Sequence, residues 1–198
     1  MSKHRERLYW AVIVVLIVVI GTLGVRLSSL SKAERTTYSA LTDGVHSSWR
    51  RAQIHLTVAI DPAGSVALGQ PERLSPARAL ELAERDLREA ELASRTYSAA
   101  LTRGIGEFPV SDMIPALMTR YADALGDLRE QFADTGSITP AMEESLTLMR
   151  NDLELFMATL PYQMLMEADP PTIGRLLDSR IRQGLTHPAA REMLGTGK

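Results

Sequence analysis

Residues 75–102 read SPARALELAERDLREAELASRTYSAALT and predict a long amphipathic helix. Ser75 is a favourable N-cap, and Pro76 suits the first helical position, where a missing N–H costs nothing. Apolar or small side chains recur every three or four residues, which is the spacing of one helix face. They are Leu80, Ala83, Leu87, Ala90, Ser94, Tyr97 and Leu101. The stretch therefore predicts a helix that buries one face against neighbouring helices.

The opposite face of this predicted helix carries acidic residues, each four positions before a basic one. Pairs with this spacing and order stabilise a helix by about 0.2–0.5 kcal/mol each. The expected pairs are Glu81 with Arg85, Glu84 with Arg88, and Glu91 with Arg95.

Three further stretches, 27–59, 111–135 and 139–160, show the same helical spacing. Gly44 weakens the first, while Gly136 suits the left-handed position just after the end of the second. Short connections between successive helices make neighbours antiparallel. No alternating run long enough for a sheet is present. The sequence therefore predicts an all-α fold, with an antiparallel four-helix bundle at its centre.

Prolines divide the C-terminal third of the chain. Pro161 is expected either to kink or to end the fourth helix, and the adjacent prolines at 170–171 predict a hard break. Beyond them, 173–183 and 188–194 are expected to form short helices. The tail 195–198 is expected to be disordered.

Outside the predicted bundle, residues 8–25 read LYWAVIVVLIVVIGTLGV, eighteen residues without a charge, between Arg7 and Arg26. As a helix this stretch would be about 27 Å long, close to the ~30 Å hydrocarbon core of a bilayer. The sequence therefore predicts a single transmembrane helix from Leu8 to Val25, through which the chain contacts lipid.

A cleaved secretory signal is the alternative, with weak cleavage sites after Gly24 and Ser31. Signal cores are typically about 7–15 residues long, however, and Tyr9 and Trp10 fit the aromatic belt of a retained helix. We therefore favour an uncleaved signal anchor.

The orientation of this anchor follows from its flanks. Basic residues near both ends are balanced, but a short N-terminal tail stays inside easily and long C-terminal domains translocate regardless of charge. We expect the N-terminus inside and the C-terminal domain outside the cell membrane. The expected organisation is a basic tail (1–7), the span (8–25), a bundle domain (26–169) with a loop at about 61–75, and a C-terminal region of short helices and disordered tail (170–198).

Composition excludes several classes of function. After Arg26, 18 basic and 23 acidic residues give an acidic balance without a basic run, which argues against a nucleic-acid partner. The chain has no cysteine, so it lacks thiolate nucleophiles and cysteine metal ligands. His46 and His55 lie on opposite faces of one predicted helix and cannot share a metal ion. We expect no catalytic residues, no cofactor and no metal.

Two regions are candidates for partner contact. Trp49 is expected to be core, with Arg50 and Arg51 splayed outward, and a contact of this tryptophan–arginine cluster with a partner is the alternative. The stretch 155–166 is apolar almost all round and too short to span a bilayer, so it is either a buried helix or a contact surface. The candidate contact residues are Trp49, Arg50, Arg51, Met157, Tyr162, Met164 and Met166.

Three short fragments resemble motifs of the LemA family: Tyr38-x-x-Leu41 with Trp49, the stretch at 112–117, and Ile105-x-x-Phe108-Pro109. An N-terminal anchor followed by a helical bundle also resembles that family. The last fragment precedes the second here, whereas in the family it ends the domain, and the double arginine expected before Asp112 is missing. We therefore assign no family from these fragments, whose resemblance would imply an architecture rather than a defined activity.

These observations favour a membrane-anchored helical bundle that acts as an accessory or assembly subunit, bound to another membrane protein or to itself. The alternative is an extracytoplasmic ligand-binding module, since antiparallel bundles suit recognition between helices. Because the N-terminal tail is too short to be an output domain, that module would need a signalling partner.

Overall fold

The computed structural model describes residues 39–62, 74–102, 113–167 and 170–195. In this part of the chain every regular element is helical, which confirms the all-α prediction for these residues. A compact unit begins at Ala40 and is described here by itself. Its helices are the segment 39–60, α2 (Pro76–Thr102), α3 (Met113–Thr135), α4 (Pro140–Thr159), α5 (Tyr162–Glu167), α6 (Pro170–Leu176), α7 (Arg182–Gly184) and α8 (Pro188–Met193), with a π-helical turn at Leu177–Ile181.

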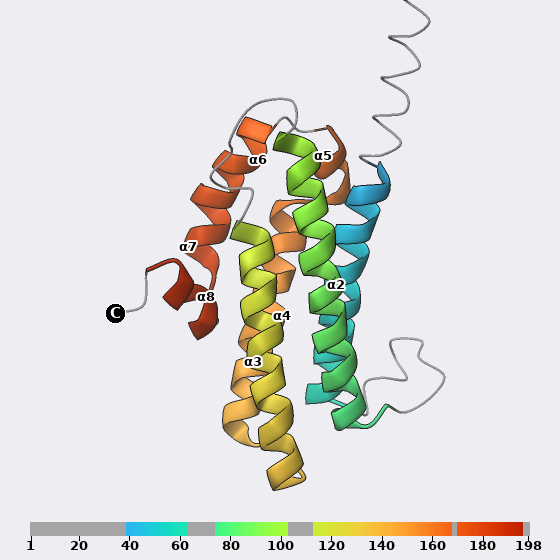
Figure 1. Cartoon of the computed structure of the whole chain (residues 1–198). Coiled ribbons are helices and arrows are strands. Elements are labelled where there is room, and N and C mark those ends of the chain that lie inside the picture. Colours follow the sequence, from blue (N-terminus) through green and yellow to red (C-terminus); the bar gives the residue numbers. More distant parts are fainter. Residues whose placement is uncertain (1–38, 63–73, 103–112, 168–169, 196–198) are drawn as a thin grey trace, which may run out of the picture. The chain divides into compact units, whose positions relative to one another are not determined.

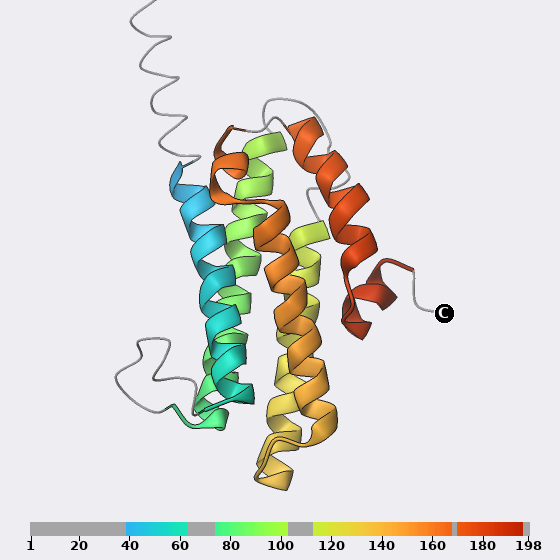
Figure 2. The same cartoon turned by 180° about the vertical axis from the view of Figure 1, so that it is seen from behind.

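Four long helices lie side by side, as Figures 1 and 2 show from opposite directions. The direction of the first pair follows from two contacts. A Cβ atom built on Gly44 would lie 3.7 Å from Ala93 of α2. His55, eleven positions further along the chain, contacts Asp86, which comes earlier in α2. The 39–60 helix and α2 are therefore antiparallel.

The other helix pairs have the same relation. Arg88 of α2 lies 2.7 Å from Asp123 of α3, and Glu84 lies 3.0 Å from Arg129. The earlier residue of α2 thus pairs with the later residue of α3, so these two helices are antiparallel. A tight turn joins α3 to α4. These contacts support the predicted antiparallel four-helix bundle.

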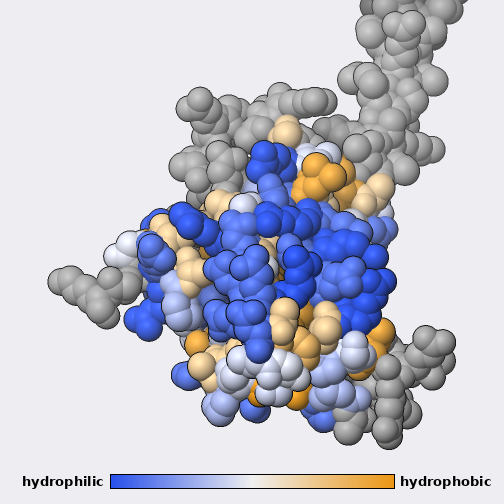
Figure 3. Space-filling model, turned by 60° about the horizontal axis from the view of Figure 1, so that its bottom comes forward, coloured by the Kyte–Doolittle hydropathy of each residue, from blue (hydrophilic) through white to orange (hydrophobic). Residues whose placement is uncertain are grey.

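The predicted apolar faces meet in the core. The rings of Trp49 and Phe156 are 5.4 Å apart between the 39–60 helix and α4, while Leu41 and Phe132, near helix ends, are only half-buried. Figure 3 shows hydrophilic residues over most of one outer face and hydrophobic residues in smaller groups. The largest fully buried side chains are Trp49, Leu56, Leu80, Leu87, Leu117, Met118, Tyr121, Leu125, Met142, Leu146, Met149 and Phe156.

The predicted caps of α3 and α4 are confirmed. The hydroxyl of Thr139 accepts a hydrogen bond from the backbone N–H of Met142 at 3.3 Å, which satisfies one of the free donors of the first turn. Gly136 has φ of 68° and donates its N–H to the carbonyl of Phe132 at 2.8 Å. Only glycine adopts this left-handed conformation without strain, which explains the residue at that position.

Prolines act as helix boundaries in two ways. Pro161 ends α4 rather than kinking it: Leu160 leaves the helical conformation with ψ of 65°, and α5 begins at Tyr162. Such a departure is common before proline, whose ring crowds the preceding residue. The prolines at 170–171 also mark a boundary, because α5 ends at Glu167 and α6 begins at Pro170, where a missing N–H is tolerated. The helix expected from residue 173 thus begins three residues earlier.

One of the three ion pairs predicted along α2 is present. Glu91 and Arg95 lie 2.7 Å apart. The other two predictions are wrong: Glu84 and Arg88 instead reach across to α3, as described above, and Glu81 pairs with Arg78 at 2.6 Å. The reason is that α3 lies within reach of this face of α2, so charges find partners between helices as well as along one.

The transmembrane helix predicted at 8–25 lies in a part of the chain that the structure does not describe. The tail 1–7, the two weak cleavage sites and the start of the helical stretch predicted at 27–59 also lie outside the described residues. Among the helices that are described, none combines the length and apolar character needed to cross a membrane.

Replacing Leu153 with alanine tests the core. This side chain is fully buried, so its loss should lower the free energy of unfolding by about 3 kcal/mol. The matched control is Leu92→Ala in α2, where the leucine is 68% exposed and the loss should stay within about 0.5 kcal/mol. Urea unfolding followed by helical circular dichroism measures both, and equal losses would contradict the described packing.

Candidate functional site

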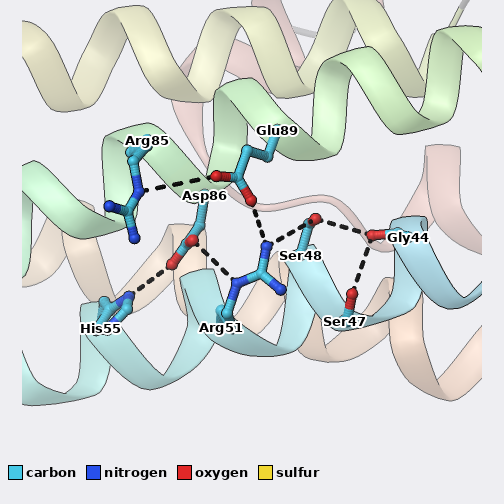
Figure 4. Close-up of polar contacts among 8 residues, drawn as sticks. All are labelled: Gly44, Ser47, Ser48, Arg51, His55, Arg85, Asp86 and Glu89. Carbon is cyan, nitrogen blue, oxygen red and sulfur yellow. Dashed lines mark hydrogen bonds and ion pairs between the residues drawn. The ribbon is translucent and has the colours of Figure 1, made fainter.

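A buried carboxylate on α2, Asp86, is the centre of a polar cluster that faces the 39–60 helix (Figure 4). Its side chain is fully buried. One oxygen, Oδ2, lies 2.6 Å from Nδ1 of His55, and the other, Oδ1, accepts a hydrogen bond from Nε of Arg51 at 3.1 Å. A buried carboxylate needs such partners, because removing an isolated charge from water is costly. Asp86 therefore ties two helices together.

Arg51 extends the cluster toward solvent. Its Nη2 donates to Glu89 of α2 and lies 3.3 Å from the hydroxyl of Ser48. Ser48 in turn donates to the carbonyl of Gly44 at 2.8 Å. Arg85 approaches the other oxygen of Glu89 at 3.8 Å, as Figure 4 shows. The cluster thus runs from a dry centre at Asp86 to an exposed edge at Glu89.

The chemistry available at this cluster is limited. A carboxylate bonded to Nδ1 of an imidazole is the orienting half of a serine–histidine–aspartate triad. Within the described part of the chain, however, no hydroxyl group is hydrogen-bonded to Nε2 of His55, the atom that would activate a nucleophile. The described residues also contain no group of acidic and histidine side chains that could hold a metal ion. What the geometry provides is a tie between helices.

A second buried carboxylate, Asp152 of α4, is 1% exposed and accepts four hydrogen bonds. Oδ1 accepts from the backbone N–H and the hydroxyl of Thr186, both at 2.8 Å. Oδ2 accepts from the hydroxyl of Tyr121 at 2.7 Å and from the backbone N–H of His187 at 3.0 Å. Asp152 thereby joins α3 and α4 to the chain that precedes α8.

His187 lies beside this carboxylate and contacts Ser145 of α4, with Nε2 3.0 Å from the hydroxyl oxygen. A serine beside a histidine suggests a catalytic pair, but the other ring nitrogen argues against it. Nδ1 accepts the backbone N–H of Ala189 at 3.2 Å. In the neutral ring the proton therefore sits on Nε2, which donates to Ser145 and cannot accept its proton. The pair is a capping arrangement for α8.

Burial governs the ionisation of these groups. It raises the pKa of Tyr121 well above its ordinary value, with the charge of Asp152 and the hydrogen bond to it adding to the rise. Burial lowers the pKa of His187, against the opposing charge of Asp152. Both side chains are therefore neutral at pH about 7, given their ordinary pKa values of about 10 and 6.5.

The predicted contact residues lie in different environments. Trp49 is fully buried, as expected of a core residue, so its ring presents no exposed surface among the described residues. Arg50 is exposed, whereas Arg51 is half-buried and paired with Asp86 and Glu89 rather than splayed outward. Arg51 differs from the prediction because α2 packs against its side of the 39–60 helix and brings Asp86 and Glu89 within reach.

The other predicted contact residues belong to the α4–α5 junction. Met157, Tyr162 and Met164 are half-buried. The side chain of Met166 is outside the described part of the structure. The stretch 155–166 is therefore partly buried, so it is neither the wholly buried helix nor the wholly exposed surface that the sequence left open.

Sequence reasoning missed both carboxylate clusters, although a signal was present. Asp86 stands three residues after Ala83 and four before Ala90, which places it on the apolar face of its helix. Asp152 stands in the same relation to Met149 and Phe156. An acidic residue at a core position predicts a buried, partnered charge. The identity of the partners depends on which helices pack together.

Comparison of the chain with protein-family models, with characterised proteins and with solved structures finds no match. The fragments that resemble LemA motifs are thus not accompanied by a family match.

Replacing Asp86 with alanine tests the tie between the 39–60 helix and α2. The loss of a buried, doubly bonded carboxylate should lower the free energy of unfolding by about 2–3 kcal/mol. Asp123→Ala is the matched control, because Asp123 also pairs with an arginine of the neighbouring helix but is 55% exposed. There the loss should stay below about 1 kcal/mol. If Asp86→Ala is as mild as the control in urea unfolding, the tie does not stabilise the bundle.

Proposed function

We propose that this protein is a membrane-anchored helical bundle that serves as an accessory or assembly subunit of a membrane complex. In this proposal Leu8 to Val25 span the cell membrane, the N-terminus lies inside and the bundle lies on the extracytoplasmic side. The partner is another membrane protein or a second copy of the chain. We assign the protein no catalytic reaction, cofactor or nucleic-acid partner.

The observation that carries the proposal is the incomplete burial of apolar side chains where α4 meets α5. Pro161 separates the two helices, and α5 is only six residues long. Met157 and Met164, on either side of this break, are each half-buried. Methionine is flexible and polarizable, so it adapts to partner surfaces of different shape. An apolar surface of this kind supports protein contact better than catalysis.

Residues of the 39–60 helix border the same junction. The ring of His46 packs edge-on against Tyr162 with centroids 6.4 Å apart. Burial lowers the pKa of His46, and the charge of Arg50 lowers it further against the opposing effect of Asp43. The imidazole is therefore neutral at pH about 7. Arg50 itself is exposed, and arginine is enriched at protein interfaces.

Cross-linking of the full-length protein in mild detergent, followed by capture and mass spectrometry, tests this proposal. We expect a stoichiometric membrane partner for the wild type. The double variant Met157→Glu with Met164→Glu should lose it, because two charges would have to be buried against the partner. Circular dichroism at rising temperature checks that the variant remains folded.

Leu92→Glu is the matched control for this experiment, since it makes the same apolar-to-acidic change at an exposed site of α2. It should retain the partner. Retention of the partner by the double variant would exclude the α4–α5 junction as the contact. Recovery of a lone monomer would contradict the accessory function and favour the alternative below.

A ligand-binding sensor module is the second candidate, and three buried polar atoms favour it. Oγ1 of Thr42, Nε1 of Trp49 and Oγ of Ser94 lack a hydrogen-bond partner among the described residues. A buried polar group without a partner costs about 1–3 kcal/mol, which a bound polar molecule would recover. A thermal-shift screen of small polar ligands distinguishes the two functions. A ligand whose stabilisation disappears in Ser94→Ala would favour the sensor.

A further inference from the structure

The last described part of the chain, residues 182–195, is called the strap here. It contains α7 and α8, which have three and six residues. Helices this short have no stability in water by themselves. Leu185 and Ala190 of the strap are buried. The strap therefore depends on its contacts with α3 and α4 for its conformation.

The hydrogen bonds of Thr186 and His187 in the strap converge on α4. Asp152 accepts three hydrogen bonds from the strap, two from Thr186 and one from the backbone of His187. Ser145 contacts the His187 ring from the same helix, and Tyr121 of α3 packs edge-on against that ring at 5.3 Å. The imidazole is thus enclosed by α3, α4 and the start of α8.

The closed strap requires the neutral form of His187. Its Nδ1 accepts the N–H of Ala189 and its Nε2 faces the hydroxyl of Ser145. Protonation would place a proton on Nδ1, directly against the N–H of Ala189. Two donors would then face each other, and the cap of α8 would be lost. A charged ring would also have to remain buried.

We propose that the strap is an acid-released latch, which opens when His187 takes up a proton and exposes the face of α3 and α4 that it covers. Asp152 is the charged group of the described residues that acts on this imidazole, and Tyr121 is the other titratable side chain in contact with it. The carboxylate favours a charged ring, but burial and the cap at Ala189 oppose it.

The direction of the pH dependence follows from proton linkage. Burial lowers the pKa of His187 in the closed strap, while in the open strap the ring returns to an ordinary pKa of about 6.5. The open form therefore binds more protons below that value. The closed form is favoured at neutral pH, and its advantage falls as the pH drops through about 6.5 toward the lowered pKa.

Amide hydrogen exchange of the full-length protein in detergent micelles tests this latch. Rates in 182–195 are compared at pH about 7.5 and about 5.5 and corrected for intrinsic exchange. Protection of the strap should fall by up to about tenfold at the lower pH. This is the change expected when a single imidazole, with a pKa of about 6.5, binds a proton only in the open form. Amides in the middle of α2 should keep their protection.

His187→Asn is the decisive variant, because asparagine is also a good N-cap but does not titrate. Its strap protection should not change between the two pH values. His46→Asn, which removes a histidine outside the strap, should keep the acid response. An unchanged wild type, or an equal loss in His187→Asn, would overturn the proposal.

A further variant covers the case in which the strap of His187→Asn is unprotected at both pH values. Ser145→Ala removes the hydroxyl that faces Nε2 but keeps the titrating ring and its bond to Ala189. Its strap should be less protected than the wild type and should still lose protection in acid. Absence of that acid response in a protected strap would contradict the latch.

Discussion

A carboxylate placed in the apolar core must be surrounded by donors, and this constraint governs how the parts of the bundle are fastened together. Asp86 and Asp152 each lie on the buried face of a long helix, where water cannot solvate them. Each uses both oxygens, and each reaches to other segments of the chain. Apolar packing alone allows two helices to shift along each other, whereas hydrogen bonds to a fixed carboxylate define which residues of the two helices are in contact.

The two carboxylates fasten different parts of the molecule. Asp86 sets the register of the 39–60 helix on α2 through His55 and Arg51, with an edge that reaches solvent at Glu89. Asp152 fastens the C-terminal strap, and its partners include a histidine that must stay neutral. In the proposed function, the hydrogen bonds of Asp86 hold in place the 39–60 helix, which follows the predicted anchor in the sequence. Those of Asp152 give the bundle a segment that can open without loss of the central core.

Much of the bundle could be predicted from periodicity and caps, because local chemistry decides them. The stripe through Leu80 and Leu87, the cap at Thr139 and the stop at Gly136 follow from residue type and spacing. What the sequence could not provide is which helices are neighbours. Arg51 was expected to point outward and instead meets Asp86, thirty-five residues away in the chain. A short helix was expected at 188–194, but the same lack of pairing information hid the attachment of this segment to Asp152.

Segment-resolved hydrogen exchange of two variants in the full-length protein shows whether each buried carboxylate fastens its own segment. Asp86→Asn should raise exchange in the 39–60 helix and leave the strap at 182–195 unchanged. Asp152→Asn should raise exchange in the strap and leave the 39–60 helix unchanged. Faster exchange of the same amides in both variants, or unchanged exchange in each variant's own segment, would show that the two carboxylates do not fasten separate segments.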